Sequence, residues 1–332
     1  MFSEKIISWY LINKRDLPWR NTRNPYKIWL SEIILQQTRV SQGLPYYYNF
    51  LEKYPTLEAL ATAPIDEVLR LWQGLGYYSR GRNLHFTANQ IVSEYQKKFP
   101  ESFEGLKKLK GVGNYTAAAI ASFAFGQKVP AIDGNALRFF SRFGGINEPI
   151  DDPNTIKSIF NFAYDLMEGA DPALFNQSVM ELGASICVPK NPKCDQCPVR
   201  PECIAFSHRL QDKLPFKSKK IKVKEKKLDY KILVNEDRIW LKLREAGDIW
   251  AGLYDFFSGE LVSKLPAAYS FQKKHILTHQ RLSISFQIII LENDETPDGG
   301  KFYSIKEIEA LPKPIVIDEA FKITMKFLDQ LS

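Results

Sequence analysis

Four cysteines lie close together in this chain and constrain its fold more than any other feature. Cys187, Cys194, Cys197 and Cys203 follow the spacing C-x6-C-x2-C-x5-C, and the rest of the 332 residues contain no cysteine. Four thiolates at this spacing can surround one metal centre, either zinc or an iron–sulfur cluster. Two disulfides are the alternative, but they are typical of small secreted proteins with thin cores. The sequence therefore predicts a loop folded around a metal centre.

Length and composition set the class of protein. A chain of 332 residues can form two domains with full cores. It contains no apolar run near the roughly 18 residues of a membrane span, and residues 1–16 carry charges where a secretory signal would be apolar. We therefore expect a cytoplasmic monomer. The net charge of +7 is compatible with a polyanionic partner but does not require one.

The spacing of apolar residues predicts an all-α domain over residues 1–210. A basic segment, residues 211–228, follows this domain. Its first 17 positions hold eight lysines against one aspartate and one glutamate, so the segment is either a plain linker or a contact with DNA. Helices are expected at residues 29–40, 61–72, 86–95, 115–125, 161–169 and 175–186.

The apolar pattern changes after the linker, and residues 229–332 are predicted to form a mixed α/β domain. Two short strands, 230–234 and 238–242, flank residues that are typical of a hairpin turn. The fold class is therefore multidomain, with an all-α domain followed by an α+β domain. A further strand is expected at 282–291, and helices at 306–311 and 317–331.

Two glycines, Gly111 and Gly113, separate a helix expected to end at Lys110 from one expected to begin near Asn114. This pattern is typical of a helix-hairpin-helix over residues 105–125. Glycine permits positive φ and close approach of the backbone, and the N–H groups at the start of the second helix form a phosphate site. We expect the hairpin to bind DNA phosphate, although a simple corner between two helices is the alternative.

Asp133 stands directly before a helix that is expected to begin at Gly134. An aspartate at such a position is ordinarily an N-cap, whose side chain accepts hydrogen bonds from helix N–H groups. Asp133 also follows the hairpin at a short interval. That combination makes a catalytic carboxylate the second interpretation.

The order of hairpin, aspartate and four-cysteine loop resembles the helix-hairpin-helix DNA glycosylase superfamily, in its iron–sulfur branch. The resemblance implies that the four cysteines hold a [4Fe–4S] cluster. In enzymes similar to endonuclease III, the second residue after the second hairpin glycine is a lysine that attacks the sugar. This chain has Tyr115 there, so the resemblance implies a monofunctional glycosylase, one that leaves the DNA strand uncut.

Three segments, residues 17–20, 25–38 and 74–80, closely resemble the adenine DNA glycosylase (MutY) family. Endonuclease III-like enzymes lack a glutamate at the position of Glu32. On its expected helix, Glu32 shares a partly apolar face with Trp29. Burial there would raise the pKa of its carboxyl and make it a proton donor. A surface charge on an amphipathic helix is the alternative.

The resemblance implies a base excision repair enzyme that acts on double-stranded DNA. Adenine opposite 8-oxoguanine, or opposite guanine, would be flipped out of the duplex and hydrolysed from its sugar. Glu32 would protonate the adenine, and Asp133 would stabilise positive charge on the sugar. Tyr115 and Asn135 would support these two carboxyl groups. The implied DNA and adenine contacts are Trp19, Arg20, Gln36, Gln37, Tyr77, Gly111, Gly113 and Gln177.

The C-terminal domain has a separate resemblance, because residues 249–256 are similar to the Nudix-like domain with which this family recognises 8-oxoguanine. A Nudix hydrolase also needs a glutamate-rich R-E-x-x-E-E helix, which is missing here, so we expect no pyrophosphate hydrolysis. The family's Phe-Ser-His loop aligns with Leu277, Thr278 and His279. Thr278 keeps a hydroxyl that can bond the damaged base, although a simple turn before a strand is the alternative.

Three other functions remain open. An endonuclease III-like pyrimidine glycosylase with lyase activity is opposed by Tyr115 and Glu32. A non-catalytic lesion-binding protein is opposed by the presence of Glu32, Asp133 and Asn135 together. A zinc-stabilised scaffold would lack the visible absorption of an iron–sulfur cluster.

Overall fold

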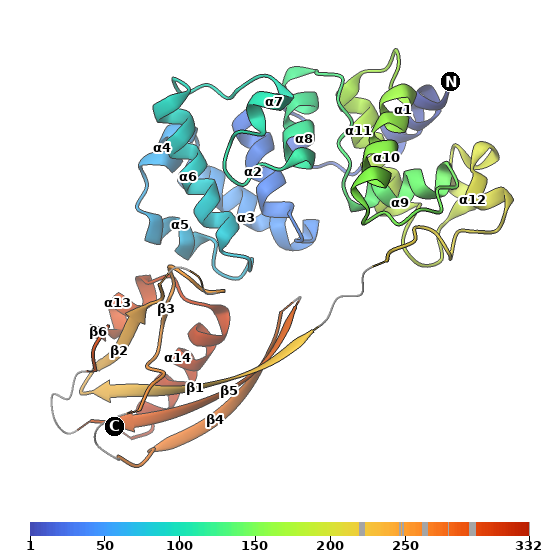
Figure 1. The fold of residues 1–332 in the computed structure, drawn as a ribbon. Helices are drawn as coiled ribbons and strands as arrows, with labels where there is room; N and C mark the ends of the chain where they lie inside the picture. The colour runs from blue at the N-terminus through green and yellow to red at the C-terminus, as the bar shows by residue number, and fades with distance from the viewer. Residues whose placement is uncertain are drawn as a thin grey trace. The chain divides into compact units, whose positions relative to one another are not determined.

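The computed structural model describes residues 1–218, 223–245, 247, 249–260, 265–277, 279–291 and 297–331. Figure 1 shows the helices and strands, coloured along the chain. The chain divides into two compact units. The second unit includes two segments from the first 85 residues, so the division differs from a single boundary near residue 210. The first unit is Met1–Gly43, Tyr54–Glu58 and Phe86–Lys220, and the second is Leu44–Lys53, Ala59–His85 and Ile221–Ser332.

The first unit is helical in its described residues, as the sequence predicted. The elements that lie wholly within it are α1 (Phe2–Asn13), η1 (Pro18–Arg20), α2 (Pro25–Leu35), α7 (Phe103–Leu106), α8 (Asn114–Phe125), α9 (Gly134–Phe143), α10 (Pro153–Leu166), α11 (Pro172–Ser185), η2 (Cys194–Gln196), η3 (Arg200–Glu202) and α12 (Ile204–Ser207). None of the helices in the described part of the chain is long and apolar enough to cross a membrane.

Several predicted helices differ in extent from the observed ones, and two of these differences have a clear cause. The helix expected over residues 29–40 ends at Leu35, because Gln37 has a positive φ of 56° that a helix does not accommodate. The helix expected over residues 61–72 is two helices, with Pro64 directly before the second. The two helices are α4 (Leu57–Thr62) and α5 (Ile65–Leu71), and their neighbours in the chain are α3 (Val40–Lys53) and α6 (Ser79–Glu94).

The core of the first unit forms where α1, α9, α10 and α11 bury their apolar faces. Ile6, Phe140, Ile159 and Leu182 are all essentially inaccessible to solvent. Asp133, Asp152 and Asp171 cap the last three of these helices through hydrogen bonds to main-chain N–H groups. The caps fix where α9 and α11 begin, and both helices carry residues of the site described below.

The second unit contains a six-stranded sheet with the order β3-β2-β1-β5-β4, and β6 pairs with β2. The predicted hairpin is confirmed, since Asn235 pairs with Arg238 across a two-residue turn. β1 also runs parallel to β5 and begins at Lys224, inside the segment predicted as linker. The elements are β1 (Lys224–Asn235), β2 (Arg238–Leu243), β3 (Tyr254–Asp255), β4 (Tyr269–Ile276), β5 (Gln280–Ile290), β6 (Lys301–Ser304), α13 (Ile305–Ala310) and α14 (Ile315–Leu328).

Within the second unit, residues of the early helical segment bind the end of the chain. The Tyr78 hydroxyl donates to the carbonyl oxygen of Lys313 at 3.2 Å, and the Lys313 main-chain N–H donates to Gln73 Oε1 at 3.3 Å. The Arg70 Nε donates to the carbonyl oxygen of Glu309 at 2.9 Å. These bonds hold the turn after α5 beside the segment that leads into α14.

Candidate active site

One cavity in the first unit has a volume of about 750 Å³ and collects most of the predicted site residues. We call it the carboxylate cavity, after its two acidic side chains. Its walls come from η1, α2, α8, the start of α9, and α11. The predicted residues that line it are Trp19, Arg20, Glu32, Gln36, Gln37, Tyr115, Asp133, Asn135 and Gln177.

Glu32 lies on α2 and only 6% of its surface is exposed. Burial raises the pKa of its carboxyl to about 7; Asp133 adds to this rise, while the Tyr115 hydroxyl and Arg20 oppose it. The alternative of a surface charge is therefore wrong. At neutral pH a large fraction of Glu32 keeps its proton, as an acid catalyst must.

Tyr115 lies in the first turn of α8 and forms a hydrogen bond with the Glu32 carboxyl. Burial raises the pKa of its hydroxyl well above the usual value, and the neighbouring carboxyl groups of Glu32 and Asp133 reinforce that rise. The hydroxyl is therefore neutral and remains a hydrogen-bond donor. Among the residues that line the cavity there is no lysine, so no amine faces Tyr115 from its walls.

Asp133 is both an N-cap and a cavity residue. Its Oδ1 accepts a hydrogen bond from Ala136 N at 2.7 Å, and its Oδ2 accepts one from Asn135 Nδ2 at 2.9 Å. Burial raises the pKa of this carboxyl, while both hydrogen bonds lower it because they favour the anion. Asp133 thus accepts hydrogen bonds that favour its anionic form.

Arg138, which the sequence did not single out, holds Asn135 in place. Its Nη2 donates to Asn135 Oδ1 at 2.9 Å and to the carbonyl oxygen of Gly183 at 2.6 Å. Its Nε donates to the carbonyl oxygen of Cys187 at 2.7 Å. A cysteine of the predicted metal loop is thereby connected to the residue that binds Asp133.

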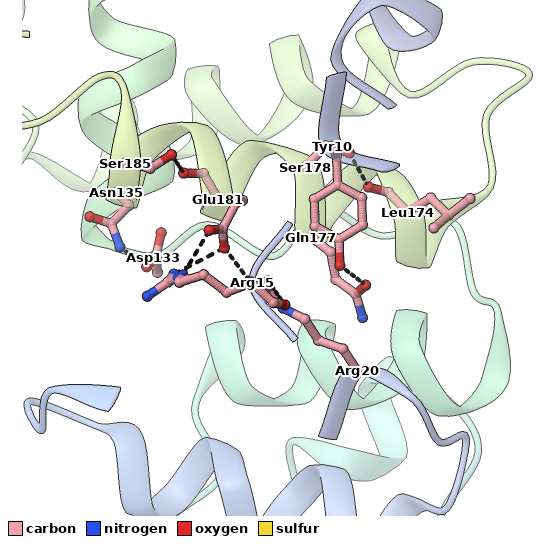
Figure 2. A network of polar contacts seen from close by, with 10 residues as sticks. All are labelled: Tyr10, Arg15, Arg20, Asp133, Asn135, Leu174, Gln177, Ser178, Glu181 and Ser185. Atoms are coloured by element: carbon pink, nitrogen blue, oxygen red, sulfur yellow. Dashed lines mark hydrogen bonds and ion pairs between the residues drawn. The ribbon is translucent and has the colours of Figure 1, made fainter. Parts of the chain in front are cut away.

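Polar residues from α11 and from the segment before α2 also line the cavity (Figure 2). The Tyr10 hydroxyl donates to Gln177 Oε1 at 2.7 Å, which leaves the amide nitrogen of Gln177 as its donor. Arg15 and Met180 also line the cavity, and sequence reasoning missed both. Helical spacing could have identified Met180, since residues 177, 180 and 184 fall on one face of α11.

The hairpin glycines differ in conformation. Gly111 has a positive φ of 77°, whereas Gly113 has an ordinary φ of −84° and is the N-cap of α8. A Cβ on Gly113 would meet no protein atom within 4 Å, so the space in front of the α8 N-terminus is open. The helix expected to end at Lys110 ends at Leu106, because the chain turns before the glycines.

All four cysteines line one small cavity in the first unit, between α9 and the residues that follow α11. The Arg142 side chain is buried beside them, and its Nη1 lies 3.5 Å from Cys187 Sγ. Burial raises the pKa of Cys194 and Cys203, and that of Cys197 to about 11. Thiolates at these positions therefore need positive charge to offset their burial.

No three metal-binding side chains of the described residues stand close enough together to hold a single ion. Four sulfurs around a shared space, beside a buried arginine, are a donor set that suits a [4Fe–4S] cluster.

A second cavity, of about 500 Å³, lies wholly within the second unit. We call it the aromatic pocket, since Tyr77, Tyr78, Trp250 and His275 line it. Trp250 and His275 are in ring contact, with centroids 6.1 Å apart.

Of the residues expected to recognise 8-oxoguanine, Leu277 and His279 line the aromatic pocket, and Thr278 lies outside the described residues. Gln37 and Tyr77 line different cavities, but each has a positive φ, 56° and 45°. Such backbone strain in a residue other than glycine commonly marks a functional position.

Two family profiles match the chain. The HhH-GPD superfamily base excision DNA repair protein profile covers residues 30–161, which include Glu32, the hairpin and Asp133. The NUDIX domain profile covers residues 230–322. These two matches confirm the helical and the C-terminal parts of the predicted fold. Neither match bears on the predicted iron–sulfur cluster.

The chain is similar to named proteins along much of its length. It is 39% identical to adenine DNA glycosylase of Buchnera aphidicola subsp. Schizaphis graminum over 261 residues, 77% of this chain and 74% of the relative. It is 43% identical to the Homo sapiens adenine DNA glycosylase over 222 residues, 64% of this chain and 41% of that protein. The solved structure of a thermostable thymine-DNA glycosylase superposes with a TM-score of 0.58 at 30% identity, over 62% of this chain and 95% of that one.

Proposed function

This chain belongs to the adenine DNA glycosylase family and is a DNA glycosylase of base excision repair, and we propose that its substrate is adenine paired with 8-oxoguanine or guanine in double-stranded DNA. The observation that carries the proposal is the pair of carboxyl groups, Glu32 and Asp133, in one cavity. Cleavage of an N-glycosidic bond needs an acid for the base and an anion for the sugar. The raised pKa of Glu32 supports it as the acid, and the hydrogen bonds that Asp133 accepts support it as the anion.

The reaction would divide these roles. With adenine flipped into the carboxylate cavity, Glu32 donates its proton to a ring nitrogen of the base, N7 by family analogy. The bond between C1′ and N9 then breaks, and its electrons leave with the base as neutral adenine. Asp133, as a carboxylate, stabilises the positive charge on the sugar until water adds to C1′ and loses a proton. The product is an abasic site in an uncut strand.

Tyr115 and Asn135 would support the two acids. The neutral Tyr115 hydroxyl hydrogen-bonds Glu32 and orients its carboxyl, and the Asn135 amide does the same for Asp133. Since a tyrosine hydroxyl cannot form an imine with the sugar, we expect no lyase activity. Trp19, Arg20, Gln36 and Gln177 are the proposed contacts of the flipped base and its strand.

We propose that the four cysteines hold a [4Fe–4S] cluster, which folds residues 187–203 into a fixed loop when bound. Arg142 supports this assignment, because its buried guanidinium faces Cys187 and also binds the carbonyl oxygens of Val188 and Pro189. Gly111 and Gly113 would present the N-terminus of α8 to a DNA phosphate, for which the open space before Gly113 leaves room.

In the second unit, we propose that the aromatic pocket recognises 8-oxoguanine. Tyr77 and Gln37 would enter the base stack at the mispair, and Thr278 and His279 would contact the damaged base. The strained backbones of Gln37 and Tyr77 support the first assignment. The cytoplasmic location and the monomeric state remain predictions.

The test uses labelled duplexes with adenine opposite 8-oxoguanine, adenine opposite guanine, thymine glycol, or no lesion. Strand breaks are scored with and without alkali. Breaks that need alkali and occur only at the mispaired adenine are the expected result. Breaks at thymine glycol without alkali would support an endonuclease III-like enzyme, and binding without any cleavage would support a lesion-binding protein.

A further inference from the structure

Glu181 is a buried carboxylate that the mechanism above does not use. It lies on α11, one turn after Gln177, and its side chain is 1% exposed. Burial alone would raise the pKa of this carboxyl, but Arg15 and Arg20 outweigh that effect and lower it. Glu181 is therefore an anion in the folded protein. A buried charge of this kind is costly unless it is paired, so its partners indicate what it does.

Both partners of Glu181 are arginines of the cavity wall (Figure 2). Oε1 accepts from Arg15 Nε at 2.7 Å, and Oε2 accepts from Arg15 Nη2 at 2.9 Å. Oε2 also accepts from Arg20 Nη2 at 2.6 Å. The side chain of Arg15 is 46% exposed, whereas that of Arg20 is 8% exposed. Arg20 is thus the more buried of the two arginines, so contacts inside the protein fix the position of its side chain.

Two further contacts fix Arg20. Its Nη1 donates to the carbonyl oxygen of Arg15 at 3.2 Å, and its guanidinium carbon lies 5.5 Å from the centroid of the Tyr10 ring. A guanidinium has five N–H groups, and these hydrogen bonds use only two of them. Arg20 lines the carboxylate cavity, whereas Glu181 is not among its lining residues. Glu181 can therefore affect a base in the cavity only through the arginines.

We propose that Glu181 is a positioning residue for base excision, which holds the Arg20 guanidinium against the cavity wall where the flipped base accepts its hydrogen bonds. This inference rests on the proposed function, because it requires an adenine in the cavity. The ring nitrogens of adenine that do not bond the sugar are hydrogen-bond acceptors, which a guanidinium can bind. A displaced Arg20 would leave the base free to move away from Glu32, and small misplacements of a reactant cost large factors in rate.

Glu181 has a second, electrostatic consequence. Tyr115, Asp133 and Arg20 are the groups that act on Glu32 in the cavity. Tyr115 and Arg20 both favour loss of the Glu32 proton, and Arg20 does so through its positive charge. The negative charge of Glu181 offsets part of the positive charge of Arg20. If that negative charge is removed while the arginine stays, the pKa of Glu32 should fall, and the alkaline limb of the pH–rate profile should move to lower pH.

The experiment compares Glu181→Gln with Glu181→Asp under single-turnover conditions. Adenine release from a duplex with adenine opposite 8-oxoguanine is measured against pH, together with duplex affinity and thermal stability. We expect Glu181→Gln to lower the rate about 10- to 100-fold with near-normal duplex affinity, and to shift the alkaline limb downward. Glu181→Asp keeps the charge, so its rate should fall while its alkaline limb stays at the wild-type pH.

A purely structural role would give a different result, in which Glu181→Gln lowers thermal stability but leaves both the rate and the alkaline limb of the folded protein unchanged. That outcome would overturn the proposal. Glu168→Gln is the matched control, because it removes an exposed carboxylate paired with Lys128 and should change neither quantity. Failure of the wild-type protein to release adenine would instead reject the proposed function.

If Glu181→Gln does not fold, a double-mutant cycle decides the question. Arg20→Lys is measured in the wild-type and in the Glu181→Asp background. If Glu181 acts through Arg20, the second change costs less in the variant than in the wild type. Additive losses would overturn the proposal, since they would mean that the two side chains act independently.

Discussion

The carboxylate cavity and the aromatic pocket show the same physical effect with opposite chemical results. In the carboxylate cavity, burial acts on acids, and it raises the pKa of Glu32 to about 7. In the aromatic pocket, burial acts on bases, and it lowers the pKa of His275 and Arg82. Low solvent access disfavours charge in both places. The first region thereby favours a proton on Glu32, whereas the second favours the neutral ring of His275.

This contrast suggests that one chain carries out the reaction in one region and recognises the lesion in another. The carboxylate cavity is the proposed site of the reaction, because its polar groups line a shared space and one of them, Glu32, has a pKa raised to about 7. The aromatic pocket is the proposed site of recognition, because Trp250 and His275 line it with their rings and His279 with a polar group. Variants in the first region should change the rate and leave lesion preference intact, and variants in the second should do the reverse.

The largest expected effect is that of Glu32→Gln. Glutamine keeps the shape of the side chain but cannot donate the carboxyl proton, so adenine release should fall by about 10²–10⁴-fold. Duplex affinity and the preference for 8-oxoguanine in binding should remain. Single-turnover release and a binding titration measure the two quantities, and near-normal turnover would remove Glu32 from the mechanism.

The same substitution should change how stability depends on pH. The folded pKa of Glu32, about 7, lies above its ordinary value of 4.5. Between these values the folded protein keeps a proton that the unfolded chain has lost, so stability falls as pH rises through this range. The shift corresponds to about 3 kcal/mol. Glu32→Gln should therefore gain about 3 kcal/mol relative to wild type between pH 4 and pH 8, measured by denaturant unfolding.

A matched control keeps that measurement specific. Glu168→Gln removes a carboxylate that is exposed to solvent in the folded protein. Its unfolding free energy should follow that of the wild type across the same pH range. If Glu32→Gln also follows the wild type, burial does not hold the proton on Glu32, and the contrast between the two regions fails.

Thr278→Ala should have a smaller effect, confined to recognition. Loss of one hydroxyl hydrogen bond should reduce the preference for 8-oxoguanine over guanine by about 1–2 kcal/mol. Competition binding with the two mispaired duplexes measures this ratio, with Thr278→Ser as the control that keeps the hydroxyl. An unchanged ratio in Thr278→Ala would place lesion recognition elsewhere in the second unit.

Tyr115→Lys should give the smallest signal, because it must create a new reaction. An amine at this position, beside Glu32, could attack the sugar as bases are released and form an imine. Borohydride should then trap a covalent complex with DNA that the wild-type protein does not form. If no complex is trapped, the cavity does not place residue 115 within reach of the sugar.

Local sequence patterns predicted the elements better than their ends. The strand after the linker and the turn before Arg238 follow from alternation of apolar residues, and both are present. The end of α2 could not be predicted this way, because it depends on the left-handed backbone of Gln37. Nor does periodicity show that β1 pairs with β5, since that pairing joins residues far apart in the chain.

The sequence by itself pointed to the two acids of the site and to Tyr115, but not to Arg15, Met180 or Arg138. Glu32, Tyr115 and Asp133 were identified from motifs, because the residue types at those positions restrict the reaction that they can support. Only the tertiary structure decided which groups act on one another. Nothing in the sequence distinguishes Glu181 from other glutamates on helices. The fold buries it against Arg15 and Arg20. Burial and pairing set the protonation state of a side chain, and both are created by neighbours that are distant in sequence.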